Sequence, residues 1–103
     1  MIMARKSVPY ENDLMEWLQD PAHAAEYINA AIEDGDREVF LLALRDVAKA
    51  RGGMTAVAEQ AKVSRTSLYK TLSPRGNPEF RSITALLHSL GLKLTVEPED
   101  KAA

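Results

Sequence analysis

The segment MTAVAEQAKVSRTSLYKTLS, residues 54–73, carries the strongest structural signal in this sequence of 103 residues. Its pattern predicts two short helices, over 55–61 and 64–73, separated by a tight turn at 62–63. Two short helices joined in this way form a helix-turn-helix, whose second helix enters the major groove of DNA. The segment therefore predicts a DNA-binding unit built from helices.

The residue types within this segment agree with the motif. Ala58 is small, as required where two helices cross closely, and Val63 and Leu68 are apolar residues that we expect to anchor the pair to a core. Ser64 is a preferred residue for capping the second helix. We expect that cap to leave the start of the helix pointing outward, where unpaired amides attract phosphate.

The outward face of the second helix is predicted to be almost wholly polar. Its members are Arg65, Thr66, Ser67, Tyr69 and Lys70. Such side chains suit hydrogen bonding to base edges in the major groove. A plainer interpretation makes Arg65 and Lys70 a solvated helix face, and packs the Tyr69 ring on the domain.

Three further helices are predicted outside this segment, over about 20–35, 36–51 and 77–91. Each begins with a capping side chain, and proline follows the cap in the first and third, at Asp20-Pro21 and Asn77-Pro78. Glycine ends each of them. Their predicted inward stripes are Ala25, Ile28 and Ile32; Phe40, Leu44 and Val47; and Phe80, Ile83, Leu87 and Leu90.

Two segments are less regular. Leu14, Trp17 and Leu18 fit one and a half helical turns, which is too short to count as a helix. Residues 92–97 alternate apolar with polar, the pattern of a β-strand. An isolated strand needs a partner, either the segment near Val8 or a second copy of the chain, which we favour.

The predicted fold class is thus all-α, a five-helix helix-turn-helix domain with a short C-terminal β-strand. A single domain is predicted over 10–97, between flexible tails at 1–9 and 98–103. One domain also suits the length of the chain.

Charge is divided unevenly along the chain, although the formal net charge is only −2. Residues 1–48 carry −6, residues 49–93 carry +6 and residues 94–103 carry −2. A partner responds to the local field rather than to the total. The basic part contains the helix-turn-helix, which favours nucleic acid as its partner.

Several classes of protein are excluded or disfavoured by composition. The chain has no cysteine, so disulfides and thiolate metal sites are excluded, and His23 and His88 lie too far apart to suggest a metal site. No signal peptide or membrane span is recognisable. Ser64, Ser67 and Ser73 lack a paired base. We expect a cytoplasmic protein that is not an enzyme and uses no cofactor.

The sequence also resembles the lambda-repressor-like (Xre/Cro-type) helix-turn-helix family, and within it the addiction-module antidote branch related to HigA-type antitoxins. The resemblance covers about residues 10–96. Its most specific pieces are DPAHAAEYINAAIEDGD, FLLALRDVAKARGGM, VSRTSLYKTLSPRGNPEF and LLHSLGLKLTV. It implies an antitoxin that neutralises a small basic RelE/ParE-like toxin encoded beside it. It further implies a homodimer that represses its own operon from a palindromic operator on double-stranded DNA.

The resemblance also assigns roles to residues of this sequence. It implies base or groove contacts by Arg65, Thr66 and Tyr69, with Ser67 on the same face. The phosphate contacts that it implies are Thr55, Ser64, Lys70, Arg75 and Asn77. A simpler interpretation makes Arg75 and Asn77 plain loop residues, because Gly-Asn-Pro is itself a turn and cap signal.

One residue departs from the family pattern. Members commonly have glycine at the start of the turn in a left-handed conformation, whereas this chain has Lys62. A lysine there would cost about 1 kcal/mol of backbone strain, which a contact between its charge and a phosphate would offset.

Other hypotheses remain open at this point. The chain could be a stand-alone Xre-type transcriptional regulator without a toxin, or a protein-binding module whose helix-turn-helix has lost contact with DNA. Trp17 and Tyr27 could mark a toxin-binding surface, although packing at the core or its rim explains them better. The acidic run Glu33, Asp34, Asp36 and Glu38 could steer a basic toxin, although a helix-to-helix turn with capping acids explains it as well and is the interpretation that we prefer.

Overall fold

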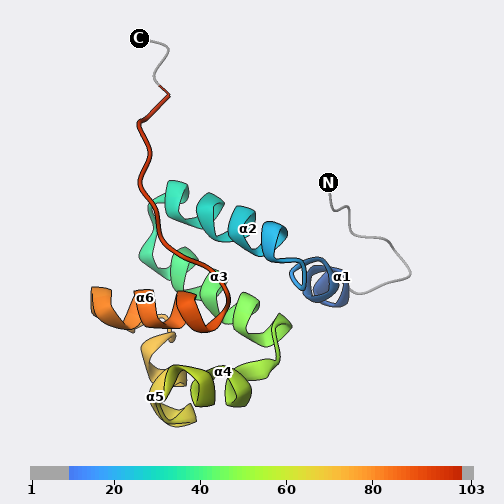
Figure 1. Ribbon diagram of the computed structural model, residues 1–103, viewed down its shortest axis with the longest axis vertical. Helices are drawn as coiled ribbons and strands as arrows, with labels where there is room; N and C mark the ends of the chain where they lie inside the picture. Colours follow the sequence, from blue (N-terminus) through green and yellow to red (C-terminus); the bar gives the residue numbers. More distant parts are fainter. Residues whose placement is uncertain (1–9, 101–103) are drawn as a thin grey trace.

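The computed structural model describes residues 10–100, which form six α-helices and contain no β-strand (Figure 1). In chain order the helices are α1 (Tyr10–Trp17), α2 (Pro21–Asp34), α3 (Arg37–Ala50), α4 (Gly53–Ala61), α5 (Arg65–Thr71) and α6 (Phe80–Ser89). The predicted N-terminal tail at 1–9, the last three residues of the predicted C-terminal tail at 98–103, and the possible partner strand near Val8 lie outside the described residues. None of the six helices is long and apolar enough to cross a membrane.

Local capping chemistry sets the starts of three helices as predicted. The Asp20 carboxylate accepts a hydrogen bond from the Ala22 amide at the start of α2. Asp36 does the same for the Glu38 amide at the start of α3, at 2.8 Å. Ser64 caps α5. Gly35 ends α2 with a φ of 83°, in the left-handed region where glycine carries no steric cost.

Two predicted helix starts are wrong by two residues. Helix α4 begins at Gly53 rather than at Thr55, and α6 begins at Phe80 rather than next to Asn77-Pro78. The residue before α6 is Glu79, whose side chain makes no capping bond. The cap-then-proline pattern at 77–78 therefore belongs to the loop before α6.

Helix α3 is the centre of the packing. It contacts α1, α2 and α4, and α4 in turn contacts α5 and α6. Leu41, Leu44 and Val47 of α3 are fully buried. The largest buried side chains of the other elements are Leu14, Leu18, Ile28, Met54, Val57, Leu68, Leu72, Leu86, Leu87 and Leu90. This single core fixes the α4–α5 pair to the rest of the molecule.

Several predicted inward residues prove to be exposed. In α2 the small residues Ala24 and Ala31 are buried, whereas Ile32 is exposed. Val63 and Phe80 are also exposed, the latter by 70%. Val63 lies in the turn before α5 and Phe80 is the first residue of α6, and no neighbouring element covers either side chain.

The first helix is longer than its apolar pattern suggested. Residues that fit only one and a half turns form α1, of eight residues. Leu14 and Leu18 are buried in the core, and α1 packs against α3. Short helices are marginal alone, so this packing rather than local preference stabilises α1.

The predicted C-terminal strand is absent, and this corrects the predicted fold class of five helices and a strand. After Gly91, the chain runs past α2 without strand pairing in the described residues (Figure 1). Leu92 is half-buried, but Leu94 and Val96 are exposed. Alternation produces a strand only where a partner strand satisfies the backbone groups. Residues 10–100 supply no such partner.

Candidate nucleic-acid interface

The turn between α4 and α5 is closed by backbone hydrogen bonds. The Val63 amide donates to the Ala58 carbonyl at 3.0 Å, and the Lys62 amide donates to the Glu59 carbonyl at 3.2 Å. This pattern requires a left-handed residue at the end of the helix. Lys62 has φ 62° and ψ 41° and is the one non-glycine residue with positive φ in residues 10–100. The lysine therefore adopts the conformation that glycine would adopt without strain.

The orientation of α5 is set by the cap at its start and by the leucines on its inner side. At its start the Ser64 hydroxyl oxygen accepts a hydrogen bond from the Ser67 amide at 3.0 Å. On its inner side, Leu68 and the following Leu72 are buried in the core. The five residues predicted to face outward, Arg65, Thr66, Ser67, Tyr69 and Lys70, are all exposed. Ala58, where the helices cross, is buried as predicted.

Arg65 is held in place by contacts that the sequence did not reveal. Its guanidinium donates from Nη1 to the Thr55 hydroxyl at 3.2 Å, which links the start of α5 to α4. It also lies over the Tyr69 ring, 5.9 Å from the centroid, at cation–π distance. The bond to Thr55 uses one of five guanidinium donors. The other four donors make no hydrogen bond within the described chain.

Tyr69 was predicted either to face outward as a groove contact or to pack its ring on the domain, and the structure shows part of each. Its side chain is 44% exposed, and its ring faces Arg65. The spacing of four residues along one helix face explains why the pair meets. The structure thus joins Thr55, Arg65 and Tyr69 into one contact group, which the sequence pattern had only placed on neighbouring surfaces.

The loop that follows α5, residues 72–79, presents two further predicted residues. Arg75 and Asn77 are exposed, and neither side chain makes a hydrogen bond or ion pair with the described residues. Between them Gly76 is buried, and its amide donates to the Ser73 carbonyl at 2.8 Å. A Cβ atom at Gly76 would overlap the Thr71 carbonyl. Glycine is therefore required for this loop to fold back against the end of α5.

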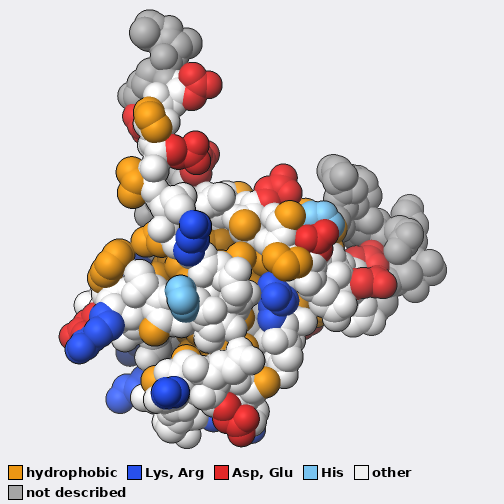
Figure 2. All heavy atoms as spheres, in the orientation of Figure 1, with side chains coloured by type: hydrophobic (Ala, Val, Ile, Leu, Met, Phe, Trp, Pro, Cys, Tyr) orange, Lys and Arg blue, Asp and Glu red, His pale blue; other side chains and the backbone are white. Residues whose placement is uncertain are grey.

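The charges of this region differ from those of the rest of the molecule. Figure 2 shows many of the acidic side chains over the C-terminal segment and near α1 and α2, and several Lys and Arg side chains, with a few acidic ones among them, toward α5 and α6. Lys62, Arg65, Lys70, Arg75 and Arg81 are all exposed in this half of the molecule. The local field beside α5 is thus suited to a polyanion.

The aromatic residues of α1 and α2 pack together at the edge of the core. Trp17 stacks on His23 at 4.5 Å between centroids and meets Tyr27 edge-on at 6.5 Å. The Tyr27 hydroxyl donates to the Asp46 carboxylate at 2.7 Å. Burial, helped by this bond to Asp46, raises the pKa of Tyr27 well above its usual value. Core packing thus accounts for both aromatics, as preferred from the sequence.

The described residues contain no group of three or more His, Asp or Glu side chains placed to hold a metal ion. His88 is exposed, as its position away from the apolar stripe predicted. His23 Nδ1 lies 2.9 Å from the Trp17 carbonyl oxygen. The Nδ1 nitrogen donates a hydrogen bond to this carbonyl oxygen and also lies 3.9 Å from the Asp20 carboxylate.

Comparison with known proteins identifies relatives of the whole helical region. Residues 10–98 match the model of a family described as "Probable addiction module antidote protein". The chain is also 35% identical over 85 residues to an uncharacterized protein of Haemophilus influenzae. That alignment covers 82% of this chain and 87% of the relative. No solved structure matches the chain.

Proposed function

The chain belongs to the family of probable addiction module antidote proteins, and we propose that it is a DNA-binding antitoxin that represses its own operon. Membership of this family implies a toxin as partner. The family of antidote proteins is not a class of enzymes. In the proposal the toxin is a small basic protein of the RelE/ParE-like kind. The α4–α5 pair is the DNA-binding helix-turn-helix.

The DNA-binding part of the proposal rests mainly on the exposure of Arg65 and on the contacts that hold its side chain. Its guanidinium is exposed on α5, and contacts with Thr55 and Tyr69 restrict its position. A side chain held in advance loses less conformational entropy on binding than a freely rotating one. Arginine also forks onto the O6 and N7 acceptors of guanine. These features support Arg65 as the principal base contact.

The remaining roles follow from the chemistry of the exposed side chains. Thr66, Ser67 and Tyr69 accompany Arg65 in the groove, and the Thr66 methyl suits the methyl of thymine. Lys70, Arg75 and Asn77 hold phosphates beside them. Thr55 and Ser64 serve as further phosphate contacts, because each hydroxyl can still donate its hydrogen. These assignments are supported by the exposure of all these side chains and by the positive charges of Arg65, Lys70 and Arg75 among them.

A homodimer on a palindromic operator completes the proposal. The α5 helix has seven residues and can reach only a few base pairs. Two such helices about 34 Å apart, one turn of DNA, would read two half-sites together. A twofold-symmetric pair would therefore give the operator specificity that one short helix lacks.

The experiment that tests this function measures binding to DNA from the promoter upstream of the gene. By fluorescence anisotropy, Arg65→Ala should weaken operator binding by about 1–3 kcal/mol and reduce the preference for the operator over unrelated DNA. Lys49→Ala is the matched control, because Lys49 is an exposed cation of α3 that pairs with Glu11 instead. Equal operator affinity of Arg65→Ala and the parent chain would show that α5 is not the recognition helix.

The antitoxin part needs a separate measurement. The product of the adjacent reading frame should arrest growth when expressed alone and be neutralised by co-expression of this chain. Co-purification of the two proteins would support direct neutralisation. If the neighbouring product is harmless and does not bind, the chain is better described as a stand-alone transcriptional regulator.

A further inference from the structure

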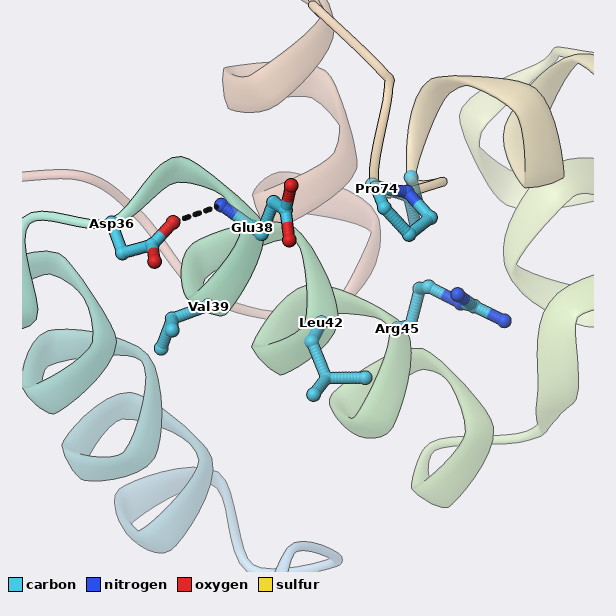
Figure 3. Close-up of a pocket in the computed structure, with 7 residues that line it drawn as sticks. Asp36, Glu38, Val39, Leu42, Arg45 and Pro74 are labelled. Carbon is cyan, nitrogen blue, oxygen red and sulfur yellow. Dashed lines mark hydrogen bonds between the residues drawn. The ribbon is translucent and has the colours of Figure 1, made fainter.

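A shallow groove of about 240 Å³ lies at the start of α3, on a surface that the proposed DNA contacts do not use. Its apolar lining comes from Val39 and Leu42 of α3 together with Leu72 and Pro74 after α5. Figure 3 shows Val39 and Leu42 projecting from one side of α3. Leu42 is 53% exposed although it sits in the middle of a helix. This arrangement leaves large apolar side chains uncovered beside a recess.

The groove has charged residues at its two ends. Asp36 and Glu38 lie at one end and Arg45 at the other (Figure 3). The Glu38 carboxylate and the Arg45 guanidinium make no hydrogen bond or ion pair with residues 10–100. Their charges therefore remain available to a partner that covers the apolar lining.

The acidic end belongs to a larger patch, the α2–α3 turn. Glu33, Asp34, Asp36 and Glu38 are all exposed there, and Arg37 is the one basic residue among positions 33–38. The turn thus carries a net charge of −3. Capping of α3 uses part of the Asp36 carboxylate, but it does not remove its charge.

We propose that this groove is the docking site for the toxin, an inference that rests on the proposed function. The toxin inserts an apolar side chain between Leu42 and Pro74, and its Lys or Arg side chains face Asp36 and Glu38. Charge complementarity selects this occupant, because the α2–α3 turn at the acidic end of the groove attracts a cationic protein.

Two other occupants fit the surface less well. DNA phosphates would be repelled by the acidic turn. A second copy of the chain docked about a twofold axis here would set the acidic end of each groove against Arg45 of the other copy, which is one cation against the four carboxylates of the α2–α3 turn. A basic protein has neither of these problems.

The test measures the affinity of the purified full chain for the toxin encoded by the adjacent reading frame, by isothermal titration calorimetry. Leu42→Glu should weaken toxin binding at least about tenfold, because it places a carboxylate in the apolar centre of the contact. Glu38→Lys should also weaken toxin binding. Because Glu38 is exposed, this variant should fold normally, and it therefore tests the site even if Leu42→Glu fails to fold. Operator affinity should stay within about twofold for both variants.

Phe80→Glu is the matched control, because Phe80 is an exposed apolar residue outside the groove. Its toxin affinity should equal that of the parent chain. Parental affinity in both groove variants would overturn the docking site while leaving the antitoxin function intact. Loss of self-association in Leu42→Glu, measured by light scattering, would assign the groove to a second copy. A parent chain that does not bind the toxin would instead overturn the proposed function.

Discussion

At the scale of single residues, Lys62 is the one non-glycine residue of the described chain with a strained, left-handed backbone. Its left-handed backbone costs an L-amino acid about 1–2 kcal/mol relative to glycine. The turn between α4 and α5 needs this conformation, because the Val63 amide reaches back to Ala58. The side chain is exposed, and in the proposed complex its charge could approach a DNA phosphate.

Lys62→Gly should raise the free energy of unfolding by about 1 kcal/mol, because glycine removes the strain but adds freedom to the unfolded chain. Urea denaturation followed by circular dichroism measures this change. Lys62→Ala is the control, since alanine keeps the strain and loses only the charge. Equal stabilisation by alanine and glycine would show that charge repulsion, not backbone conformation, is the cost.

At the scale of elements, the loop between α5 and α6 depends on a glycine for a reason different from that of the helix ends. Gly76 does not have a positive φ; it is required because the Thr71 carbonyl leaves no space for a Cβ. The loop presents Arg75 and Asn77 on either side of this contact. Its shape therefore sets where these two side chains would meet a phosphate in the proposed complex.

Gly76→Ala should lower the free energy of unfolding by about 1–3 kcal/mol, the usual cost of overpacking. It should also weaken operator binding, because relief of the clash moves the loop. Thermal denaturation and anisotropy measure the two effects. For comparison, Gly35→Asn introduces a side chain where nothing lies within 4 Å, and asparagine tolerates the left-handed region. A Gly76 variant as stable as the Gly35 variant would contradict the steric argument.

At the scale of the whole molecule, negative and positive charge are separated between the first half of the sequence and the stretch that follows it. The stretch 49–93, which contains α4 to α6, carries +6, whereas residues 1–48 carry −6. In the proposed function this separation lets one small domain attract a polyanion at α5 and a cationic protein at the α2–α3 turn. The formal net charge of the whole chain, −2, reveals neither of these opposite local charges.

Operator affinity should consequently fall as salt rises, with a linear dependence of log affinity on log salt concentration. Anisotropy titrations between about 50 and 200 mM salt measure the slope. Lys70→Ala should reduce the magnitude of that slope by about one, because one phosphate contact is lost, and should weaken binding similarly on all sequences. A slope near zero would mean that phosphate contacts do not contribute.

Much of this molecule is readable from short stretches of its sequence. The caps at Asp20, Asp36 and Ser64, the left-handed stop at Gly35 and the turn at Lys62 involve neighbours within a few positions, so local pattern predicts them. The exposed face of α5 follows from the same helical period. These are interactions between groups that the chain holds close together in any compact state.

The tertiary structure decided what depended on distant residues. The sequence could not show that α1 becomes a helix by packing on α3, that Val63 and Phe80 lie uncovered, or that residues 92–97 find no strand partner within residues 10–100. Nor could it show Arg65 held between Thr55 and Tyr69, or Leu42 beside Pro74. In each case the free energy comes from a contact between separate elements, and no local pattern encodes which elements meet.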